Sequence, residues 1–392
     1  MLSQLTPCEE KLVLPHSGKS FSIGIPSEDF AEETRMPLTP QGVEVLVAQG
    51  HKILMERGAG LAARFSDEDY AAAGAELTDD ADRVFASDIV LKVAPPSAKQ
   101  AERMRKGQIL VCLISRNVRD AEPFAILAEK KVTLVAADAM VSAGDREPSV
   151  VRSLGEMEGV MAVTAAANVL EQPNGGKGII VGGVTGVPPT EVVILGAGSS
   201  AVSAARAAVA FGSNVKVFDT SLAKLQSLEW HMPHHVFTSV LHPQALSKAL
   251  GSADVIICTR HEGCKPPFRI PVDYLALLKH DAVIVDLDVV AGGRTEVSRP
   301  TSPANPVFRS HGLFFHCLPD ITVLASHTAT IILSDSVSPL LSQIAAQGGI
   351  EQAARLSGTV ASSVAMFRGT VTNRFLAERT RLEYFDLRLL LV

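Results

Sequence analysis

A run of branched apolar residues that ends abruptly in glycine constrains the fold of this chain more than any other feature. Residues 191–201 read EVVILGAGSSA, in which a strand-like segment is followed by Gly196, Gly198 and Ala201. The spacing G-x-G-x-x-A permits a tight strand-to-helix turn, close approach of the backbone to a ligand, and close packing of the next helix on the sheet. The small-residue segment AVSAARAAVAF that follows predicts this helix. The stretch therefore predicts a strand, a glycine turn and a helix of an α/β fold.

The same turn has the features of a dinucleotide-binding site. A helix amino terminus offers unpaired N–H groups and a positive dipole end to phosphates, and Ser199 and Ser200 add hydroxyl donors. The next predicted strand, NVKVFD, ends in Asp219, at the spacing where a carboxylate binds the adenosine ribose hydroxyls. Because this carboxylate would repel a 2′-phosphate, we expect NAD rather than NADP. The alternative is an α/β turn that merely uses glycine, with Asp219 capping a loop. The candidate cofactor contacts are Gly196, Gly198, Ser199, Ser200, Ala201, Asp219 and Lys224.

Apolar runs alternate with amphipathic or alanine-rich stretches along the chain, which is typical of α/β layering with parallel strands. Strands are predicted in two series, over 21–26, 51–56, 88–93, 108–114 and 132–138, and over 191–198, 214–219, 254–259, 282–288 and 312–319. Helices are predicted over 39–50, 66–77, 147–178, 326–347 and 349–358. We expect a discontinuous substrate domain, residues 1–149 plus 322–392, into which an NAD-binding domain, residues 150–321, is inserted. A ligand cleft between the two domains is expected.

Composition excludes several other classes of protein. Hydrophobic residues make up 47% of the 392 residues and charged residues 20%, as in ordinary globular proteins. The formal net charge of −6 argues against nucleic acid or an anionic membrane as the main partner. The five cysteines show no metal-ligand spacing and are expected to be reduced thiols in a reducing compartment. The amino terminus does not read as a signal peptide, and no apolar run approaches the ~20 residues of a membrane span, so a cytoplasmic protein is expected.

Several longer segments resemble the alanine dehydrogenase family, which also contains the NAD-binding component of nicotinamide nucleotide transhydrogenase. The segments are SIGIPSEDFAEETRMPLTPQGVEVLVAQGHKILMERGAG, GGKGIIVGGVTGVPPTEVVILGAG and VIVDLDVVAGGRTEVSRPT, in the family's order and at similar spacing. The resemblance extends from about residue 21 to the carboxyl terminus. It implies two Rossmann-like domains around a cleft, NAD in the second domain, and a homo-oligomer, either a dimer or a hexamer. The implied reaction is the reversible oxidative deamination of L-alanine to pyruvate and ammonia.

The resemblance also implies site residues, and most of them are substituted here. Arg35 lies where the family places the arginine that binds the substrate carboxylate, a role that suits the guanidinium fork. Ala94 stands at the position of the substrate-binding lysine, Ser115 at that of the catalytic histidine, and Val290 at that of an aspartate. A positioned acid or base contributes roughly 10²–10⁴ in rate, which alanine, serine and valine cannot supply near neutral pH. Either other groups take over the chemistry, or the reaction is slow or absent.

Four polar residues are candidates to replace the missing groups. Lys92 lies inside a predicted strand and is as well explained by a structural ion pair. Asp288 follows the strand 282–288, where catalytic groups gather in this fold class, although a loop-capping role fits equally. His316 alternates with apolar neighbours, which favours a core histidine. Asp320 lies where the family has an asparagine near the nicotinamide. The predicted catalytic set is Arg35, Lys92, Asp288 and Asp320.

Three functions remain open on the sequence alone. The first is an NAD-dependent dehydrogenase of the alanine dehydrogenase type that acts on L-alanine or a related small amino acid and its 2-oxo acid. The second is a regulatory NAD-binding paralogue that has lost turnover, which the residues at 94, 115 and 290 favour. The third is a transhydrogenase-like hydride-transfer component. Its arginine-containing segment reads EGVM here, with Met161 in place of the arginine.

Overall fold

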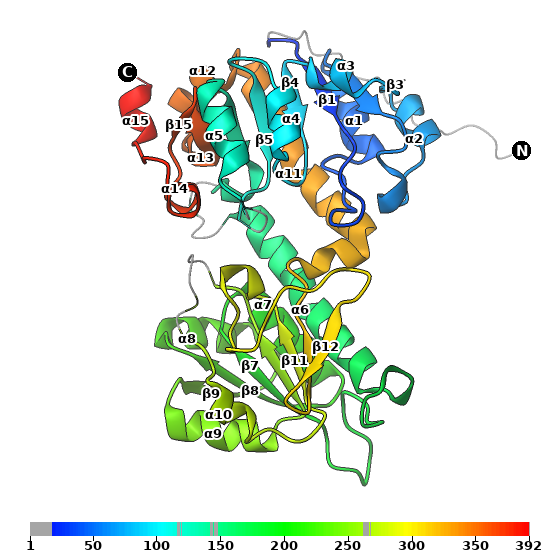
Figure 1. The fold of residues 1–392 in the computed structure, drawn as a ribbon, viewed down its shortest axis with the longest axis vertical. Coiled ribbons are helices and arrows are strands. Elements are labelled where there is room, and N and C mark those ends of the chain that lie inside the picture. Colours follow the sequence, from blue (N-terminus) through cyan, green and yellow to red (C-terminus); the bar gives the residue numbers. More distant parts are fainter. Residues whose placement is uncertain are drawn as a thin grey trace, which may run out of the picture.

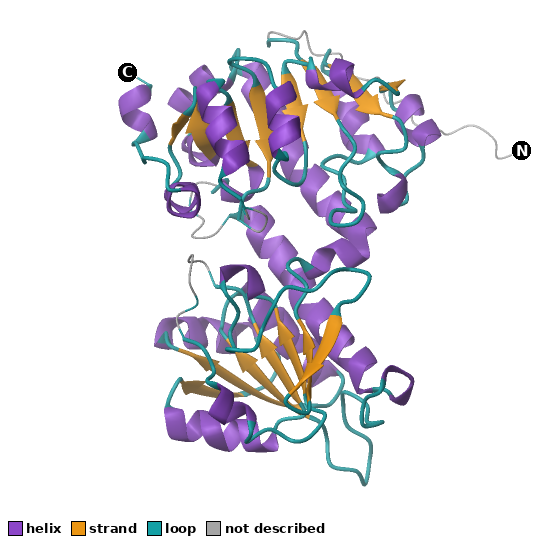
Figure 2. Cartoon of the chain, in the orientation of Figure 1, coloured by secondary structure: helices purple, strands orange, loops and turns teal. Residues whose placement is uncertain are grey.

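The computed structural model of this chain describes residues 18–391, except 116, 117, 119, 142, 143, 145–147, 262–265 and 267. Two sheets are each flanked by helices, and they lie at opposite ends of the elongated molecule (Figures 1 and 2). Almost all neighbouring strands within the two sheets are parallel. The predicted α/β class with two Rossmann-like halves is therefore confirmed.

The first sheet combines strands from the two ends of the described chain. Its order is β15-β14-β6-β5-β4-β1-β2-β3, and β14 pairs antiparallel with both β6 and β15. Its strands are β1 (Ser22–Ile25), β2 (Lys52–Glu56), β3 (Glu76–Thr78), β4 (Ile89–Leu91), β5 (Ile109–Cys112), β6 (Thr133–Ala136), β14 (Val364–Phe367) and β15 (Thr370–Val371).

The second sheet is built from the middle of the chain. Its order is β12-β13-β11-β10-β7-β8-β9, with β12 antiparallel at one edge. The glycine turn follows β7, an interior strand that pairs with β10 and β8. The strands are β7 (Glu191–Leu195), β8 (Asn214–Asp219), β9 (Phe237–Val240), β10 (Val255–Cys258), β11 (Val283–Asp286), β12 (Val307–Ser310) and β13 (Leu313–His316).

Two long helices, α6 and α11, run between the sheets and contact each other (Figure 1). They lie where the chain enters and leaves the second sheet. The helices are α1 (Pro40–Ala48), α2 (Asp67–Ala72), α3 (Ala81–Phe85), α4 (Ala98–Arg103), α5 (Glu122–Glu129), α6 (Ser149–Leu170), α7 (Ser199–Ala210), α8 (Leu222–His231), α9 (Pro243–Ser252), α10 (Val272–Leu275), α11 (Ser326–Ala346), α12 (Ile350–Leu356), α13 (Gly358–Ser363), α14 (Arg374–Thr380) and α15 (Leu387–Leu390).

Local signals explain where the early helices begin and end. Thr39 caps α1 by accepting from the N–H of Gly42, and Ser66 caps α2 in a capping box with Asp69. The prediction of one helix over 66–77 is wrong at its carboxyl end, because α2 stops at Ala72. Gly74 then takes a φ of +96°, which turns the chain into the short strand β3.

Helix α6 packs tightly against α7, the helix that follows the glycine turn. A Cβ built on Gly159 would lie 2.2 Å from the carbonyl oxygen of Ser200, and one on Gly155 would lie 2.4 Å from Ser199 Oγ. Only a residue without a side chain permits this approach. The contact fixes the start of α7 against the helix that links the two halves.

The segment Ile321–Ala346, which ends with α11, is the one described stretch long and apolar enough to cross a membrane, with a mean hydropathy of 1.2. The sequence predicts no membrane span, since no apolar run approaches ~20 residues. Because 56% of it is buried inside the fold, where α11 packs against α1, α6 and α12, it is accounted for as a core helix. Cys112, Cys258 and Cys317 are buried free thiols, as predicted. Cys8 and Cys264 lie outside the described residues.

Candidate functional site

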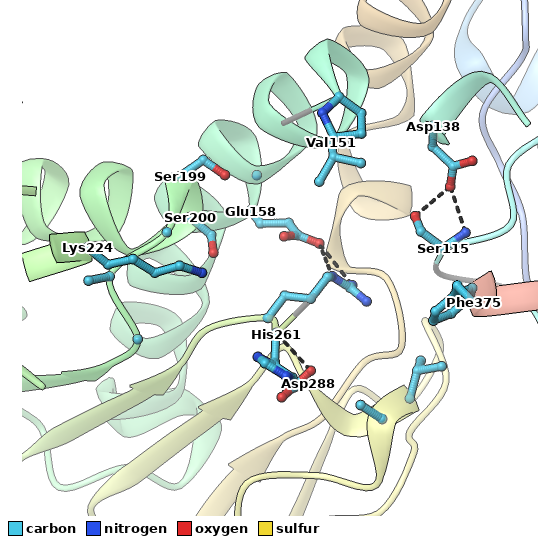
Figure 3. Close-up of a pocket in the computed structure, with 18 of the residues that line it drawn as sticks. Ser115, Asp138, Val151, Glu158, Ser199, Ser200, Lys224, His261, Asp288 and Phe375 are labelled. Carbon is cyan, nitrogen blue, oxygen red and sulfur yellow. Dashed lines mark hydrogen bonds and ion pairs between the residues drawn. The ribbon is translucent and has the colours of Figure 1, made fainter. Parts of the chain in front are cut away.

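A cavity of about 410 Å³ lies where the glycine turn of the second sheet faces residues from the other half of the chain. Its volume is that of a small-molecule site. Figure 3 shows Ser199, Ser200 and Lys224 on one side of this cavity and Ser115 and Phe375 on the other. The predicted ligand cleft is therefore present, and both halves of the molecule line it.

The glycine turn leaves an open backbone surface in the cavity. Gly196 has a φ of +117°, and a Cβ there would lie 2.1 Å from Thr259 Oγ1, so only glycine fits. At Gly198, by contrast, a Cβ would meet no atom of the described residues within 4 Å. Gly198 is also the N-cap of α7, and it has no side chain to accept the first N–H groups of the helix. This open, donor-rich surface fits the diphosphate of a dinucleotide.

Asp219 lines the cavity and also holds the turn in place. Its Oδ2 accepts from the N–H of Ala197 at 2.8 Å, and its Oδ1 accepts from the N–H of Ser221 at 2.7 Å. Lys224 points into the same side of the cavity (Figure 3). Ala201 is fully buried in the core instead and does not line the cavity. Ala201 allows α7 to pack closely on the sheet. The other six predicted cofactor residues all line the cavity.

Asp288 lines the cavity just after β11 and is 1% exposed. Its Oδ1 accepts from the N–H of His261 at 3.1 Å (Figure 3). Its Oδ2 lies 3.3 Å from Nε of Arg294. Burial raises the pKa of Asp288 to about 6, although Arg294 and the His261 N–H oppose the rise. A carboxyl with this pKa exchanges protons near neutral pH.

An ion pair that the sequence analysis missed lies beside Asp288. Arg260 follows β10, and its Nη2 is 3.0 Å from Oε1 of Glu158 on α6 and donates to the carbonyl of Pro319 at 3.2 Å. Glu158 is 1% exposed. No local pattern marks this pair, because its members are 102 residues apart. The pair ties the wall of the cavity to α6.

Arg35 is not brought to this cavity. Its Nε and Nη2 donate to the two oxygens of Glu33, at 2.7 and 2.6 Å. Its Nη1 donates to Asp320 and to Thr322, both at 2.8 Å, and its side chain is 0% exposed. Burial alone lowers the pKa of Arg35, but Asp320 and Glu33 outweigh burial and raise it. In this structure, Arg35 and Asp320 form an internal ion-pair network and not a ligand-facing pair.

Lys92 is also internal. Its Nζ lies 2.6 Å from Oε2 of Glu28, and the two side chains are 1% and 3% exposed. Burial raises the pKa of Glu28 in spite of this lysine. His316 is buried on β13 away from the cavity, and burial lowers its pKa to about 4. Of the predicted catalytic residues, Asp288 is therefore the one that the described structure places in the cavity.

The three substituted positions fall in two places. Ser115 and Val290 line the cavity, whereas Ala94 lines a separate hollow beside Pro95 and Phe124. The Ser115 hydroxyl donates to Oδ2 of Asp138 at 2.5 Å (Figure 3). Val290 is apolar and carries no group that transfers protons. Asp288, two residues before Val290, supplies a carboxylate to the same wall.

Known proteins resemble this chain over most of its length. Residues 24–158 match the model of the alanine dehydrogenase/PNT N-terminal domain, and residues 162–374 match that of the C-terminal domain. The chain is 32% identical to an alanine dehydrogenase of Methanococcus maripaludis over 365 residues, which cover 92% of this chain and 97% of that protein. A solved L-alanine dehydrogenase superposes with a TM-score of 0.82 at 28% identity, covering 92% of this chain and 99% of the other. A transhydrogenase from Sinorhizobium meliloti has a TM-score of 0.73 at 21% identity, covering 90% and 99%, and shares the fold.

The predicted family and fold class are confirmed, and the predicted cofactor, NAD, agrees with both. The matched regions include the glycine turn, Asp219 and Asp288. The chain therefore belongs to the alanine dehydrogenase/PNT family.

Proposed function

We propose that this protein is an NAD-dependent oxidoreductase of the alanine dehydrogenase type, which interconverts L-alanine, or a related small amino acid, with its 2-oxo acid and ammonia. One observation carries the proposal: a single cavity contains the open glycine turn and a buried carboxylate with a pKa of about 6. The division into domains of residues 1–149 plus 322–392 and 150–321, and assembly into a homo-oligomer, are parts of the same proposal.

Different residues of the chain bind the cofactor and transfer the proton. Bound NAD supplies a hydride acceptor in one direction and a hydride donor in the other. The N–H groups at the start of α7 bind the diphosphate, and Asp219 binds the adenosine ribose hydroxyls. During oxidation Asp288 takes a proton from the substrate ammonium group as the substrate carbon gives up its hydride. Water from solvent then adds to the resulting imine carbon and ammonia leaves, and reduction runs the same steps in reverse. Arg260, held by Glu158, supplies positive charge beside Asp288.

The direct experiment mixes purified protein with NAD and L-alanine, and in the reverse direction with NADH, pyruvate and ammonia. Absorbance of the reduced nicotinamide is followed in both. The proposal expects reversible turnover that depends on both substrates. If NADH binds but is consumed no faster than in buffer across a panel of 2-oxo acids, the dehydrogenase proposal fails.

A regulatory NAD-binding protein without turnover is the second candidate. It is favoured by the chemistry at two cavity positions, because the Ser115 hydroxyl is engaged by Asp138 and Val290 is apolar. The same assay separates the candidates, since a regulatory protein binds NADH without consuming it. No described contact favours the transhydrogenase-like alternative.

A further inference from the structure

Two arginines from distant parts of the chain face the cavity beside Asp288. Arg294 follows the loop after β11, and Arg379 lies on α14 near the carboxyl terminus. The mechanism proposed above uses neither of them. Arg294 lies inside the region matched by the C-terminal family model, residues 162–374, whereas Arg379 falls beyond its last matched residue.

Arg294 is a buried cation with unused donors. It is 2% exposed and lies over the ring of Phe268, with its guanidinium carbon 4.7 Å from the ring centroid. Its Nε and Nη1 make no hydrogen bond to any part of the chain that the structure describes. The nearby anion is Asp288, whose Oδ2 is 3.3 Å from Nε but likewise accepts no hydrogen bond from the described residues. Burial of unpaired donors is unfavourable, and an anionic ligand would relieve it.

Arg379 reaches the same wall from the other half of the molecule. Its Nη2 donates to the carbonyl of Val290 at 3.0 Å. Its Nε is buried and has no partner within the described residues. Phe375, one turn earlier on α14, lies on the side of the cavity opposite Lys224 (Figure 3). Arg294 and Arg379 therefore both supply positive charge to the part of the cavity wall that Asp288 and Val290 form.

We propose that Arg294 and Arg379 form the subsite that binds the substrate carboxylate, in place of Arg35. The inference rests on the proposed function and names the ligand class of this subsite: a 2-oxo or 2-amino monocarboxylate. Two guanidinium groups offer charge-assisted hydrogen bonds to the two carboxylate oxygens. A carboxylate on Arg294 brings the adjacent carbon next to Asp288, because the two side chains are in contact. Arg35 does not compete for this ligand, since its donors are taken up by Glu33, Asp320 and Thr322.

A phosphate of the cofactor is a second source of the same anionic chemistry. A Cβ on Gly196 would lie 3.8 Å from Nη2 of Arg294, so this arginine is also close to the glycine turn. Binding measurements distinguish the two sources. Loss of a carboxylate subsite weakens binding of the substrate analogue alone, whereas loss of a phosphate contact weakens binding of the coenzyme.

The probe is oxamate, an unreactive analogue of pyruvate, titrated calorimetrically into the protein saturated with NADH. We expect R379Q to weaken oxamate binding by about tenfold or more, while NADH affinity stays within about twofold. R294Q should act in the same direction, and R379K should restore part of the binding. The control is R309Q, which removes a half-exposed arginine remote from the cavity and should change neither affinity.

Several outcomes overturn the subsite. One is unchanged oxamate binding by folded R379Q, which decides the matter even if R294Q does not fold. Another is an equal loss of affinity for NADH and for oxamate, which identifies a contact with a cofactor phosphate. A third is wild-type protein that binds NADH but not oxamate at millimolar concentration. If wild-type protein binds no NADH, the proposed function fails instead, and titration of oxamate alone into the same variants decides the subsite.

Discussion

At the scale of single residues, Asp288 is the group whose protonation should set the pH dependence. Burial raises its pKa from 3.8 to about 6, so the carboxylate that accepts a proton predominates above pH 6 and is lost below it. We expect kcat/KM for amino-acid oxidation to fall about tenfold per pH unit below pH 6 and to be level above it.

D288N should lose roughly 10²–10⁴ in kcat and this pH dependence together, with NADH affinity retained. The matched control is D335N, at an exposed position on α11. A profile that still breaks near pH 6 in D288N would exclude Asp288 as the titrating group.

Asp219 should determine the choice between NAD and NADP. D219N keeps one oxygen, which can still accept from the N–H of Ala197, but loses the acceptor for the N–H of Ser221 and removes the negative charge that repels a 2′-phosphate. We expect the ratio of the NADP to the NAD dissociation constants to fall by about tenfold or more, which is ~1.4 kcal/mol. Equilibrium binding of NADH and NADPH measures this ratio. D219A also leaves the N–H of Ala197 without its acceptor, and it should therefore weaken the binding of both coenzymes. Unchanged selectivity in D219N would remove Asp219 from the account.

At the scale of elements, the contact between α6 and α7 positions the glycine turn. G159V places a side chain against the Ser200 carbonyl. The Cβ atom alone would lie 2.2 Å from the carbonyl oxygen. Overpacking of this kind costs about 1–3 kcal/mol, and urea unfolding should show it. G251A on α9 is the matched control, because its nearest neighbour would be at 3.8 Å, and it should be neutral or stabilising by about 0.5–1 kcal/mol. Equal stability of G159V and wild type would contradict this contact.

The sequence predicted the elements that carry strong local signals. The ten long apolar runs all contain strands, and Asp219 and Gly198 belong to one continuous stretch whose spacing is itself the signal. The short strands β3, β9, β12, β14 and β15 were missed, because two to four residues have little periodicity of their own, and all of these strands except β14 lie at a sheet edge. Arg294 and Arg379 were missed for a different reason. Their place in the cavity depends on the tertiary fold, which brings residues 290 and 379 together.

At the scale of the whole molecule, the Arg35 network joins the start of the first sheet to the chain returning from the second. Its partners Asp320 and Thr322 are 285 and 287 residues away, a pairing that no local pattern reveals. R35A would leave Glu33 and Asp320 buried without their cation, and should cost about 3–5 kcal/mol of unfolding free energy. Thermal and urea unfolding test this, with R309Q as the exposed control. Wild-type stability of R35A with selective loss of oxo-acid binding would restore Arg35 as the substrate ligand.

The account as a whole depends on the open backbone at Gly198 being the site of the coenzyme diphosphate. G198A tests this most directly, because Gly198 has an ordinary φ of −82° and a Cβ there would meet nothing within 4 Å in the part of the chain that the structure describes. We expect G198A to unfold at the wild-type midpoint but to bind NADH at least about tenfold more weakly, measured by calorimetry. A folded G198A that binds NADH as tightly as wild-type protein would contradict the account.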